Sequence, residues 1–439
     1  MSEPSPSQVP SNKQHARHNF RTGVMAGILG AVGRDLVHPQ LILAGLIYAL
    51  SKSPVLVALV TIINKAFTMA PQLLASSFLE HSPRRRPQFI FLTFVRGTAF
   101  TLLALAVWLL TFYYNAATTT LFFLVYALAC LSTACAHVVY MDMIGRLIPA
   151  EKTGSYIGIR SFLGGAVTIL VGFLVIQPIL GEINLPWNYI ILASMGALFV
   201  ILDMGTWCFC REEPGPKAKE KTSFAGSLQR GLKWLRRDHN YRCYLIQRLG
   251  FRVSFIGLAF FIPYGSEEVV KGTATAGGIA LMGGIMVAIL KTSRTFGALL
   301  CGKLADFFDS RVALIMGAAL FILAPLTALL APHLPSAFAF DIPGGTVDLP
   351  LLIYFTALAM MGLALQATMV GGRRFLIVNA PAHRRASYIG FLNTLTSPLT
   401  LLPLLGAYIA SAWGMQTLFL FVATGGLISL TGAISMTES

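Results

Sequence analysis

The chain carries little charge for its length. Only 12% of its 439 residues are Asp, Glu, Lys or Arg, about half of the roughly 25% that is usual in soluble domains. A soluble protein of this size needs a charged surface around its core, and this composition cannot supply one. The shortage of charge therefore excludes an ordinary soluble globular protein.

Motifs that would indicate an enzyme are also missing. The sequence contains no P-loop, no zinc-binding helix motif and no nucleophile elbow. None of its six cysteines falls in a predicted external loop, so we expect no disulfide framework. We expect neither an enzyme nor a protein that holds a cofactor or a metal ion.

The sequence is instead rich in long apolar segments. About 20 apolar residues are needed for an α-helix to cross the hydrocarbon core of a bilayer. Twelve stretches satisfy this requirement, and they are residues 22–50, 54–79, 88–113, 118–148, 154–178, 187–209, 241–266, 274–303, 312–331, 350–378, 385–411 and 414–435. The sequence therefore predicts an all-α integral membrane protein with twelve transmembrane helices.

The distribution of positive charge indicates an orientation, because Lys and Arg concentrate in cytoplasmic loops. They occur in the N-terminal tail and in the loops after even-numbered spans, whereas the opposite loops contain only Lys52 and Lys271. We therefore expect a multi-pass protein of the bacterial inner membrane with both termini in the cytoplasm. The net charge of +15 then reflects topology and attraction to anionic membrane lipids, and we expect no nucleic-acid partner.

The predicted spans fall into two sets of six around a polar middle segment. Residues 22–209 and 241–435 are expected to form two six-helix bundles. Residues 1–21 form a polar tail rich in Pro and Ser, for which disorder is expected, without the features of a signal or transit peptide. Residues 210–240 are expected to be a cytoplasmic linker.

The second part of this linker has the pattern of an amphipathic helix. One helical face would carry Phe224, Leu228, Leu232 and Leu235, with Arg230, Lys233 and Arg237 elsewhere. Such a helix either lies on the cytoplasmic membrane surface or is a solvated linker helix.

A short phrase occurs twice in the chain. PAEKTGSYIG occupies residues 149–158 and PAHRRASYIG occupies residues 381–390, with six of ten residues identical and an offset of 232. Each copy follows the fourth span of its own half. The repeat indicates a duplicated six-helix unit whose two copies are related by an axis along the membrane normal.

A second correspondence links the loops that follow the second span of each half. GKLADFFDSR (302–311) resembles the signature loop of the major facilitator superfamily of secondary transporters, glycine-x-leucine-x-aspartate-arginine-x-glycine-arginine-arginine. Gly302, Leu304, Asp306 and Arg311 match this pattern, Phe307 replaces the first arginine, and Asp309 replaces the second glycine. The first-half copy, SSFLEHSPRR (76–85), has Glu80 in place of the aspartate and keeps Arg84 and Arg85.

The resemblance covers nearly the whole chain from about residue 20. It implies that the protein moves a small solute across the membrane by alternating access. It also implies that Asp306 pairs with basic or helix-end groups of its own half and latches the outward-facing state. The expected gating residues are Glu80, Arg84, Arg85, Gly302, Asp306 and Arg311. A topology signal or a helix cap is the alternative, above all for Glu80. The superfamily's antiporter motif of the fifth helix is not found in 154–178, and its arginine early in the fourth span is absent from 118–135.

Charged residues inside the predicted spans are the candidates for substrate binding, because a charge in the bilayer costs several kcal/mol without a partner or a wet cavity. They are Arg34, Asp35, Lys65, Asp142, Arg248, Arg252, Lys291, Arg294, Arg373 and Arg374. By resemblance, the first, fourth, seventh and tenth helices form the main cavity walls. Arg248 and Arg252 are four residues apart and Lys291 and Arg294 three apart, so each pair shares one helical face.

Bases outnumber acids in this set, which favours an anionic substrate, a carboxylate or a phosphate, bound by some of Arg248, Arg252, Lys291 and Arg294. Asp35 is the candidate proton-coupling group, and a pairing with Lys65 or Arg34 is the alternative. Symport of a monoanion with one proton is electroneutral, which favours uptake against the membrane potential.

The repeat also sets a register between the halves. Aligning the two SYIG phrases places Asp142 at the position equivalent to Arg374. An acid and a base at equivalent positions suggest an ion pair between the halves or a shared site. Local pairing of Asp142 with Arg146, four residues later, is the alternative.

The sequence thus predicts a secondary active transporter, expected to be a monomer, that moves a small organic or phosphate-bearing anion with proton coupling. An exporter of small hydrophobic or drug-like compounds is one alternative. A transporter-like scaffold or sensor without transport is another.

Overall fold

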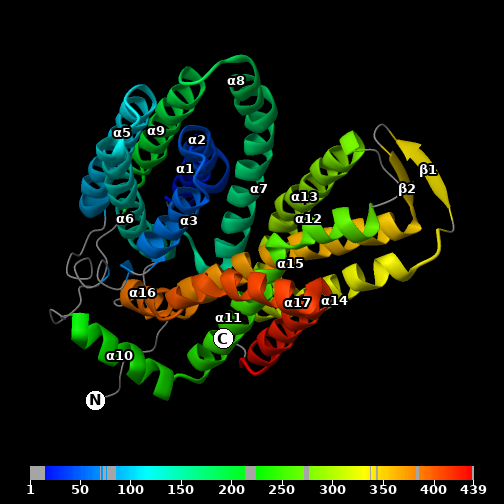
Figure 1. Cartoon of the computed structure of the whole chain (residues 1–439). Coiled ribbons are helices and arrows are strands. Elements are labelled where there is room, and N and C mark those ends of the chain that lie inside the picture. The colour runs from blue at the N-terminus through cyan, green and yellow to red at the C-terminus, as the bar shows by residue number, and fades with distance from the viewer. Residues whose placement is uncertain are drawn as a thin grey trace. The chain divides into compact units, whose positions relative to one another are not determined.

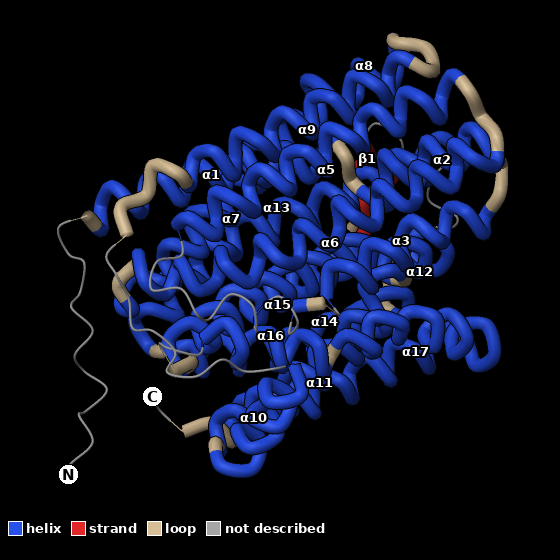
Figure 2. Tube along the Cα trace, turned by 90° about the vertical axis from the view of Figure 1, so that its left-hand side faces the viewer, coloured by secondary structure: helices blue, strands red, loops and turns tan. Residues whose placement is uncertain are grey.

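The computed structural model describes residues 15–69, 71–72, 76, 86–212, 224–270, 276–336, 338–342, 345–381 and 385–437. These residues are almost all helical, apart from one β-hairpin (Figures 1 and 2). The chain divides into two compact units. Unit 1 contains Met1–Tyr156, Val167–Phe224 and Ala380–Gly390, and unit 2 contains Ile157–Ala166, Ala225–Asn379 and Phe391–Ser439.

Unit 1 is built mainly from the helices of the first half of the sequence. They are α1 (Ala16–Leu36), α2 (Ala44–Ser51), α3 (Pro54–Met69), α5 (Arg86–Phe112), α6 (Ala116–Leu147), α8 (Gln177–Glu182), α9 (Trp187–Trp207) and the two ends of α7 (Thr153–Val171), whose middle part Ile157–Ala166 belongs to unit 2. Single π-helical turns at Pro39–Leu43 and Gly172–Ile176 join α1 to α2 and α7 to α8. Within this unit α1 packs along α9, α5 packs on α6 and α9, and α3 packs on α6.

Unit 2 is built mainly from the helices of the second half. They are α10 (Phe224–Arg237), α11 (His239–Ser254), α12 (Phe261–Tyr264), α13 (Ala276–Phe308), α14 (Ser310–Leu330), α15 (Leu349–Asn379), α16 (Arg385–Leu395) and α17 (Leu402–Ile434). Strands β1 (Ala339–Ile342) and β2 (Gly345–Asp348) pair antiparallel between α14 and α15.

The packing of unit 2 repeats that of unit 1. The α11–α17 pair corresponds to α1–α9, α14–α15 to α5–α6, α14–α17 to α5–α9, and α13–α15 to α3–α6. Helices that hold the same place in the order of the two halves therefore pack against equivalent helices. This agreement is the three-dimensional counterpart of the repeated SYIG phrase.

Every predicted span contains helix in the structure, although not every one passes a test of length and hydropathy. Among the described residues, eight helical stretches are long and apolar enough to cross a membrane, and a ninth is the pair His239–Ala259 and Phe261–Val269, bent by 43°. One of the eight, Ser397–Ile434, contains the later part of the predicted span 385–411 and nearly all of 414–435, and α16 covers the start of the former. The first span falls short because charges interrupt it, and the second because only 16 residues of it are described as α3. The first also starts at Ala16 rather than at residue 22.

A glycine separates the last two spans. Gly414 has φ 85° and ψ 163° inside α17, a region that is essentially closed to residues with a Cβ. The helix direction changes at this residue, so α17 consists of two helical segments that correspond to two predicted spans.

Close packing fixes α11, the helix that carries two of the predicted substrate-binding residues. A Cβ added at Gly250 would lie 2.2 Å from the main-chain nitrogen of Ser429 on α17. Gln247 Nε2 donates to Ser429 Oγ at 3.1 Å, and Ser254 Oγ donates to the Val422 carbonyl at 3.0 Å. Only glycine at position 250 allows this backbone approach, and α11 is thereby held against α17.

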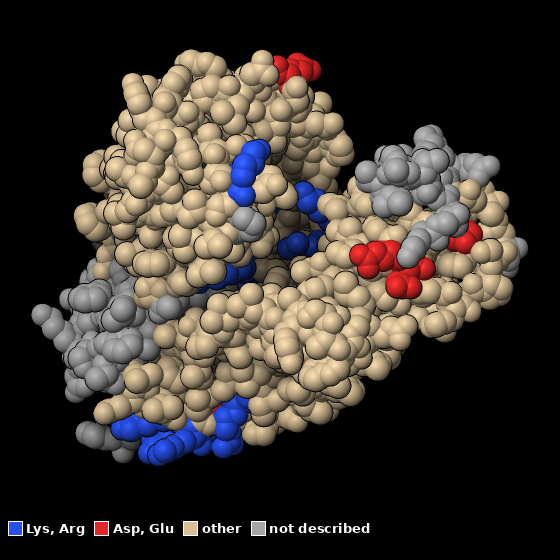
Figure 3. Space-filling view, viewed as in Figure 1, with Lys and Arg blue, Asp and Glu red and all other residues tan. Residues whose placement is uncertain are grey.

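The linker helix α10 packs on other parts of unit 2 through Gly231 and Trp234. A Cβ added at Gly231 would overlap the Phe391 ring, and Trp234 meets Tyr241 edge-on at 6.4 Å. Leu228 and Leu232 of the same helix are 40% and 47% exposed. Basic side chains gather on the surface over α10 (Figure 3). The structure thus has a helix over Phe224–Arg237 whose Leu228 and Leu232 are exposed.

Candidate functional site

Arg248 on α11 is held by neutral groups. Its Nη1 donates to Tyr244 Oη at 3.3 Å and its Nη2 donates to Asn393 Oδ1 on α16 at 2.9 Å. Tyr244 Oη in turn donates to the Gly372 carbonyl at 3.3 Å. The Tyr244 ring stacks on Phe375 of α15, with centroids 4.5 Å apart. Three helices of unit 2 thus fix the orientation of this guanidinium.

Arg248 keeps its positive charge without an acidic neighbour. Among the described residues no carboxylate forms an ion pair with it. Arg248 lies nine residues after His239, about 14 Å along the α11 axis at roughly 1.5 Å per residue. A cation at that depth is expected to serve a partner that arrives from outside the fold.

The other predicted basic residues of unit 2 differ in exposure. Arg252, one turn after Arg248 on the same face of α11, is buried. Lys291 near the middle of α13 is exposed, and its ammonium group makes no hydrogen bond or ion pair with any described residue. Arg294 is half-buried one turn further along α13. Arg248 and Lys291 are therefore cations of the predicted set that form no ion pair with a described carboxylate.

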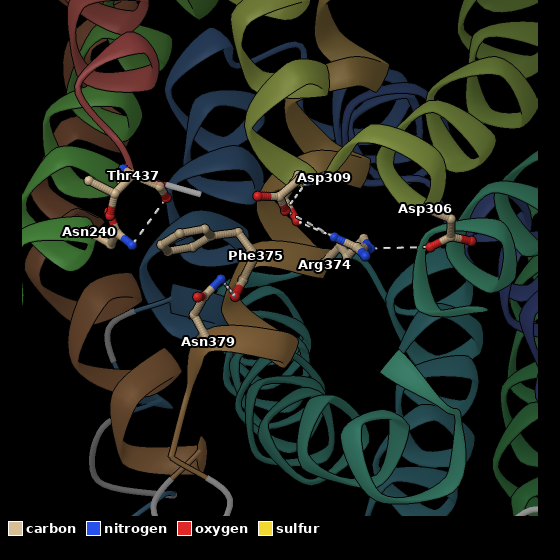
Figure 4. A network of polar contacts seen from close by, with 8 residues as sticks. Asn240, Asp306, Asp309, Arg374, Phe375, Asn379 and Thr437 are labelled. Carbon is tan, nitrogen blue, oxygen red and sulfur yellow. Dashed lines mark hydrogen bonds and ion pairs between the residues drawn. The ribbon is translucent and has the colours of Figure 1, made fainter. Parts of the chain in front are cut away.

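Arg374 forms the centre of a network at the junction of α13 and α14 (Figure 4). Its Nε donates to Asp306 Oδ1 at 3.2 Å, and its Nη1 lies 3.2 Å from Asp309 Oδ1 and 3.0 Å from Ser310 Oγ. The side chains of Arg374 and Asp306 are 11% and 10% exposed. The α15 arginine therefore ties the α13–α14 junction to α15.

Asp309 takes part in this network from a strained backbone. Its φ is +98° and its ψ is 157°, a conformation that favours glycine. Asp309 occupies the position where the superfamily's signature loop has glycine. Its carboxylate accepts from the Ser310 main-chain nitrogen at the start of α14 and pairs with Arg374. Asp309 thus combines a backbone conformation that favours glycine with a carboxylate that pairs with Arg374.

The other members of the second-half loop lie nearby. Gly302 is buried on α13, and Arg311 Nη2 donates to the Ile434 carbonyl at the end of α17 at 2.7 Å. The pairing of Asp306 with a basic group of its own half, implied by the resemblance, is present. Its role as a latch stays a prediction. The first-half residues Glu80, Arg84 and Arg85 lie outside the described residues.

Unit 1 contains a second network, centred on Asp142 of α6. Arg146 Nε donates to Asp142 Oδ2 at 3.1 Å, and Arg146 Nη1 lies 3.9 Å from Glu212 Oε1. Arg385 Nη1 lies 3.9 Å from Asp142 Oδ1. Glu212 Oε2 also accepts from the Arg86 main-chain nitrogen at 2.7 Å. The structure thus contains the local ion pair of Asp142 with Arg146. This pair was the alternative to an ion pair between the two halves.

Asp35 on α1 is half-buried, and its carboxylate forms no ion pair or hydrogen bond with any described residue. The alternative pairing with Arg34 or Lys65 is therefore not formed. Its function in proton coupling stays a prediction.

Sequence reasoning missed an ion pair inside unit 1. Arg96 Nη1 of α5 lies 3.6 Å from Asp203 Oδ2 of α9, and both side chains are 6% exposed. The sequence did contain a signal, because Arg96 interrupts the predicted span 88–113. Asn393 gave no signal, since an amide in an apolar stretch has no distinctive pattern.

Comparisons with known proteins agree with this architecture. The family model described as Major Facilitator Superfamily matches residues 24–398. A bacterial homologue of the iron transporter ferroportin, in an outward-facing state, is similar with a TM-score of 0.72 and 13% identity, covering 94% of this chain and 98% of that chain. The E. coli fucose:proton symporter FucP has a TM-score of 0.70 at 15% identity, with 97% and 100% covered.

The human organic anion transporter MFSD10 has a TM-score of 0.63 at 15% identity, with 98% of this chain and 100% of that chain covered. No curated protein matches the sequence. Identities of 13–15% show a common fold alone.

Proposed function

Since the chain belongs to the Major Facilitator Superfamily, we propose that it is a secondary active transporter that takes up a small anion together with a proton. The anion is an organic carboxylate or a phosphate-bearing compound. Transport proceeds by alternating access of a site inside the bilayer, as duplicated transporters of this kind require.

The observation that carries this proposal is that Arg248 is held by neutral groups. Its hydrogen bonds go to the neutral oxygens of Tyr244 and Asn393, and no described carboxylate offsets its charge. Lys291 adds a second cation of the same kind. A membrane protein tolerates such charges where an anion or a wet cavity meets them. A substrate cation would instead be repelled.

Asp35 is the proposed proton carrier. Acidic side chains in membrane helices serve as proton relays in transporters, and the Asp35 carboxylate forms no ion pair or hydrogen bond with any described residue. Co-transport of one proton makes the uptake of a monoanion electroneutral. Without the proton, the membrane potential would oppose entry by about 2.3 kcal/mol per charge per 100 mV.

The network of Arg374, Asp306 and Asp309 is the proposed latch. Its contacts join the α13–α14 junction to α15, so any motion that separates these elements must break two ion pairs. The two relatives described as a fucose:proton symporter and an organic anion transporter are compatible with proton coupling and with an anionic cargo. The ferroportin homologue shares the fold as well, so a direct test of charge selectivity is needed.

A ligand-stabilisation screen provides this test. We expect benzoate, lactate or inorganic phosphate to raise the thermal unfolding temperature of the purified protein, and the Arg248→Gln and Lys291→Gln variants to lose this effect. Stabilisation by organic cations alone would favour the exporter of hydrophobic compounds. A lack of response to every small solute would favour a scaffold or sensor.

We further propose that both termini are cytoplasmic, in a bacterial inner membrane, and that the exposed face of α10 contacts anionic lipid on that side. Exposed Leu228 and Leu232 lie beside exposed basic residues, the combination that binds the surface of an anionic bilayer. We also propose that the transporter acts as a monomer, which the mass of the purified protein in detergent would test.

The α10 contact predicts a lipid preference. Phosphatidylglycerol should raise the unfolding temperature of the wild-type chain more than phosphatidylcholine does. The Lys233→Gln/Arg236→Gln/Arg237→Gln variant should lose most of that difference, because its surface charge is removed. Lys52→Gln removes an exposed lysine on the predicted opposite side and serves as the control. An equal loss in the Lys52→Gln variant would contradict the contact.

A further inference from the structure

Asn393 presents an unusual partner to Arg248. The amide oxygen of Asn393 accepts a hydrogen bond from Arg248 Nη2 at 2.9 Å, and the residue is only 7% exposed. Arg248 is half-buried, and an arginine within a membrane helix is normally expected to meet a carboxylate. Asparagine has nearly the shape of aspartate and supplies the hydrogen bond without the charge.

Tyr244 completes the same arrangement. Its hydroxyl hydrogen is directed to the Gly372 carbonyl, so its oxygen accepts from Arg248 Nη1. Both groups that hold Arg248 therefore act as neutral acceptors. They fix its orientation and leave its charge unneutralised.

The unused donors of Arg248 show what this orientation can bind. A guanidinium has five N–H donors, and Arg248 donates two hydrogen bonds to the described residues. Its Nε is buried and has no hydrogen-bond partner among them. The Nη–H groups that Tyr244 and Asn393 do not occupy are therefore the donors from which a carboxylate or phosphate can accept.

We propose that Asn393 is the specificity-determining residue of the site: its neutral amide positions Arg248 so that a carboxylate or phosphate accepts hydrogen bonds from the Nη donors that Tyr244 and Asn393 leave unused. This inference rests on the proposed function. It adds that anion selectivity depends on the absence of a negative charge at position 393.

The Asn393→Asp variant of the full chain tests this directly. It keeps the size and the acceptor oxygen, and it adds a carboxylate within hydrogen-bond distance of Arg248. We expect the affinity for benzoate or inorganic phosphate, measured by calorimetry, to fall at least tenfold at pH 7, and the unfolding temperature to stay the same or rise. Affinity should return as the pH is lowered and the introduced carboxyl becomes protonated.

A second variant separates positioning from a purely structural role. Asn393→Leu removes the acceptor and leaves the charge of Arg248 free, so we expect a smaller loss of affinity than for Asn393→Asp and no recovery at low pH. A structural role predicts the reverse order, because aspartate retains the hydrogen bond and leucine does not. Asn240→Asp is the control. It makes the same chemical change on α11, about two turns before Arg248, where the side chain contacts Thr437, and it should leave the affinity for benzoate or phosphate unchanged.

The outcomes distinguish this inference from the proposed function. If the wild-type protein binds benzoate or phosphate and Asn393→Asp binds them equally well, the role of Asn393 is overturned while anion transport stands. The reverse order of the two variants would also overturn it. If the wild-type protein binds only cations, the proposed function fails, and the assignment of Asn393 fails with it.

Discussion

The Arg374→Met variant is expected to lose about 3–5 kcal/mol of unfolding free energy, because it leaves two partly buried carboxylates without their common cation. Asp306 and Asp309 both have an oxygen 3.2 Å from this guanidinium. Their side chains are only 10% and 21% exposed, so water replaces the lost partner poorly. Chemical unfolding in detergent micelles measures the loss.

Arg242→Met is the matched control for this variant. Arg242 is an exposed arginine of the same unit, on α11, and its replacement should change the unfolding free energy by no more than about 0.5 kcal/mol. A similar loss in both variants would mean that Arg374 contributes only as a surface charge, and the latch would lose its physical basis.

Asp309 provides a second, independent check of this network. Its backbone conformation costs about 1–3 kcal/mol in a residue other than glycine, and its contact with Arg374 offsets that cost. Asp309→Gly should therefore stabilise the Arg374→Met background, where the contact is already lost. The same substitution in the wild-type chain removes the strain and the contact together, so it should bring less stability or none. Equal effects in both backgrounds would show that Asp309 and Arg374 are not coupled.

The second large effect is expected at the ion pair inside unit 1. Arg96→Met leaves the buried Asp203 carboxylate without the guanidinium that lies 3.6 Å away. Breaking such a pair from one side costs about 3–5 kcal/mol. The unfolding free energy of the variant should fall by that amount, again measured by chemical unfolding.

Neutralising the second partner should rescue this variant. In Arg96→Met/Asp203→Asn a neutral amide replaces the carboxylate at position 203, and most of the lost stability should return, because the penalty comes from a buried charge that has lost a cationic partner. Arg17→Met removes an exposed arginine of α1 and controls for loss of positive charge in general. A double variant no more stable than Arg96→Met alone would contradict the charge-based explanation.

The architecture was largely predictable from the sequence. A lipid environment requires about 20 apolar residues per helix, so each predicted range corresponds to helix in the structure. The SYIG repeat gave the duplication, which the packing of α11 on α17 and of α1 on α9 reproduces. Boundaries were less certain where polar residues enter a helix: α1 starts at Ala16 inside the predicted tail.

The pairing of charged side chains was not predictable to the same degree. Register placed Asp142 at the position equivalent to Arg374, but a side chain pairs with whatever lies within about 4 Å, and helix packing decides that. Asp142 meets Arg146, while Arg374 meets Asp306 and Asp309. Asn393 could not be found at all, because its importance comes from the arginine of another helix.

Uptake into proteoliposomes under an imposed pH gradient tests the central claim most directly. The vesicle interior is made alkaline, and valinomycin with potassium sets the membrane potential independently. Using the carboxylate or phosphate that stabilises the protein most, we predict accumulation that follows the pH gradient, is the same at all potentials, and is lost in the Arg248→Gln and Asp35→Asn variants. Accumulation of cations, or anion flux that follows the potential and ignores the pH gradient, would contradict the proposed anion–proton symport.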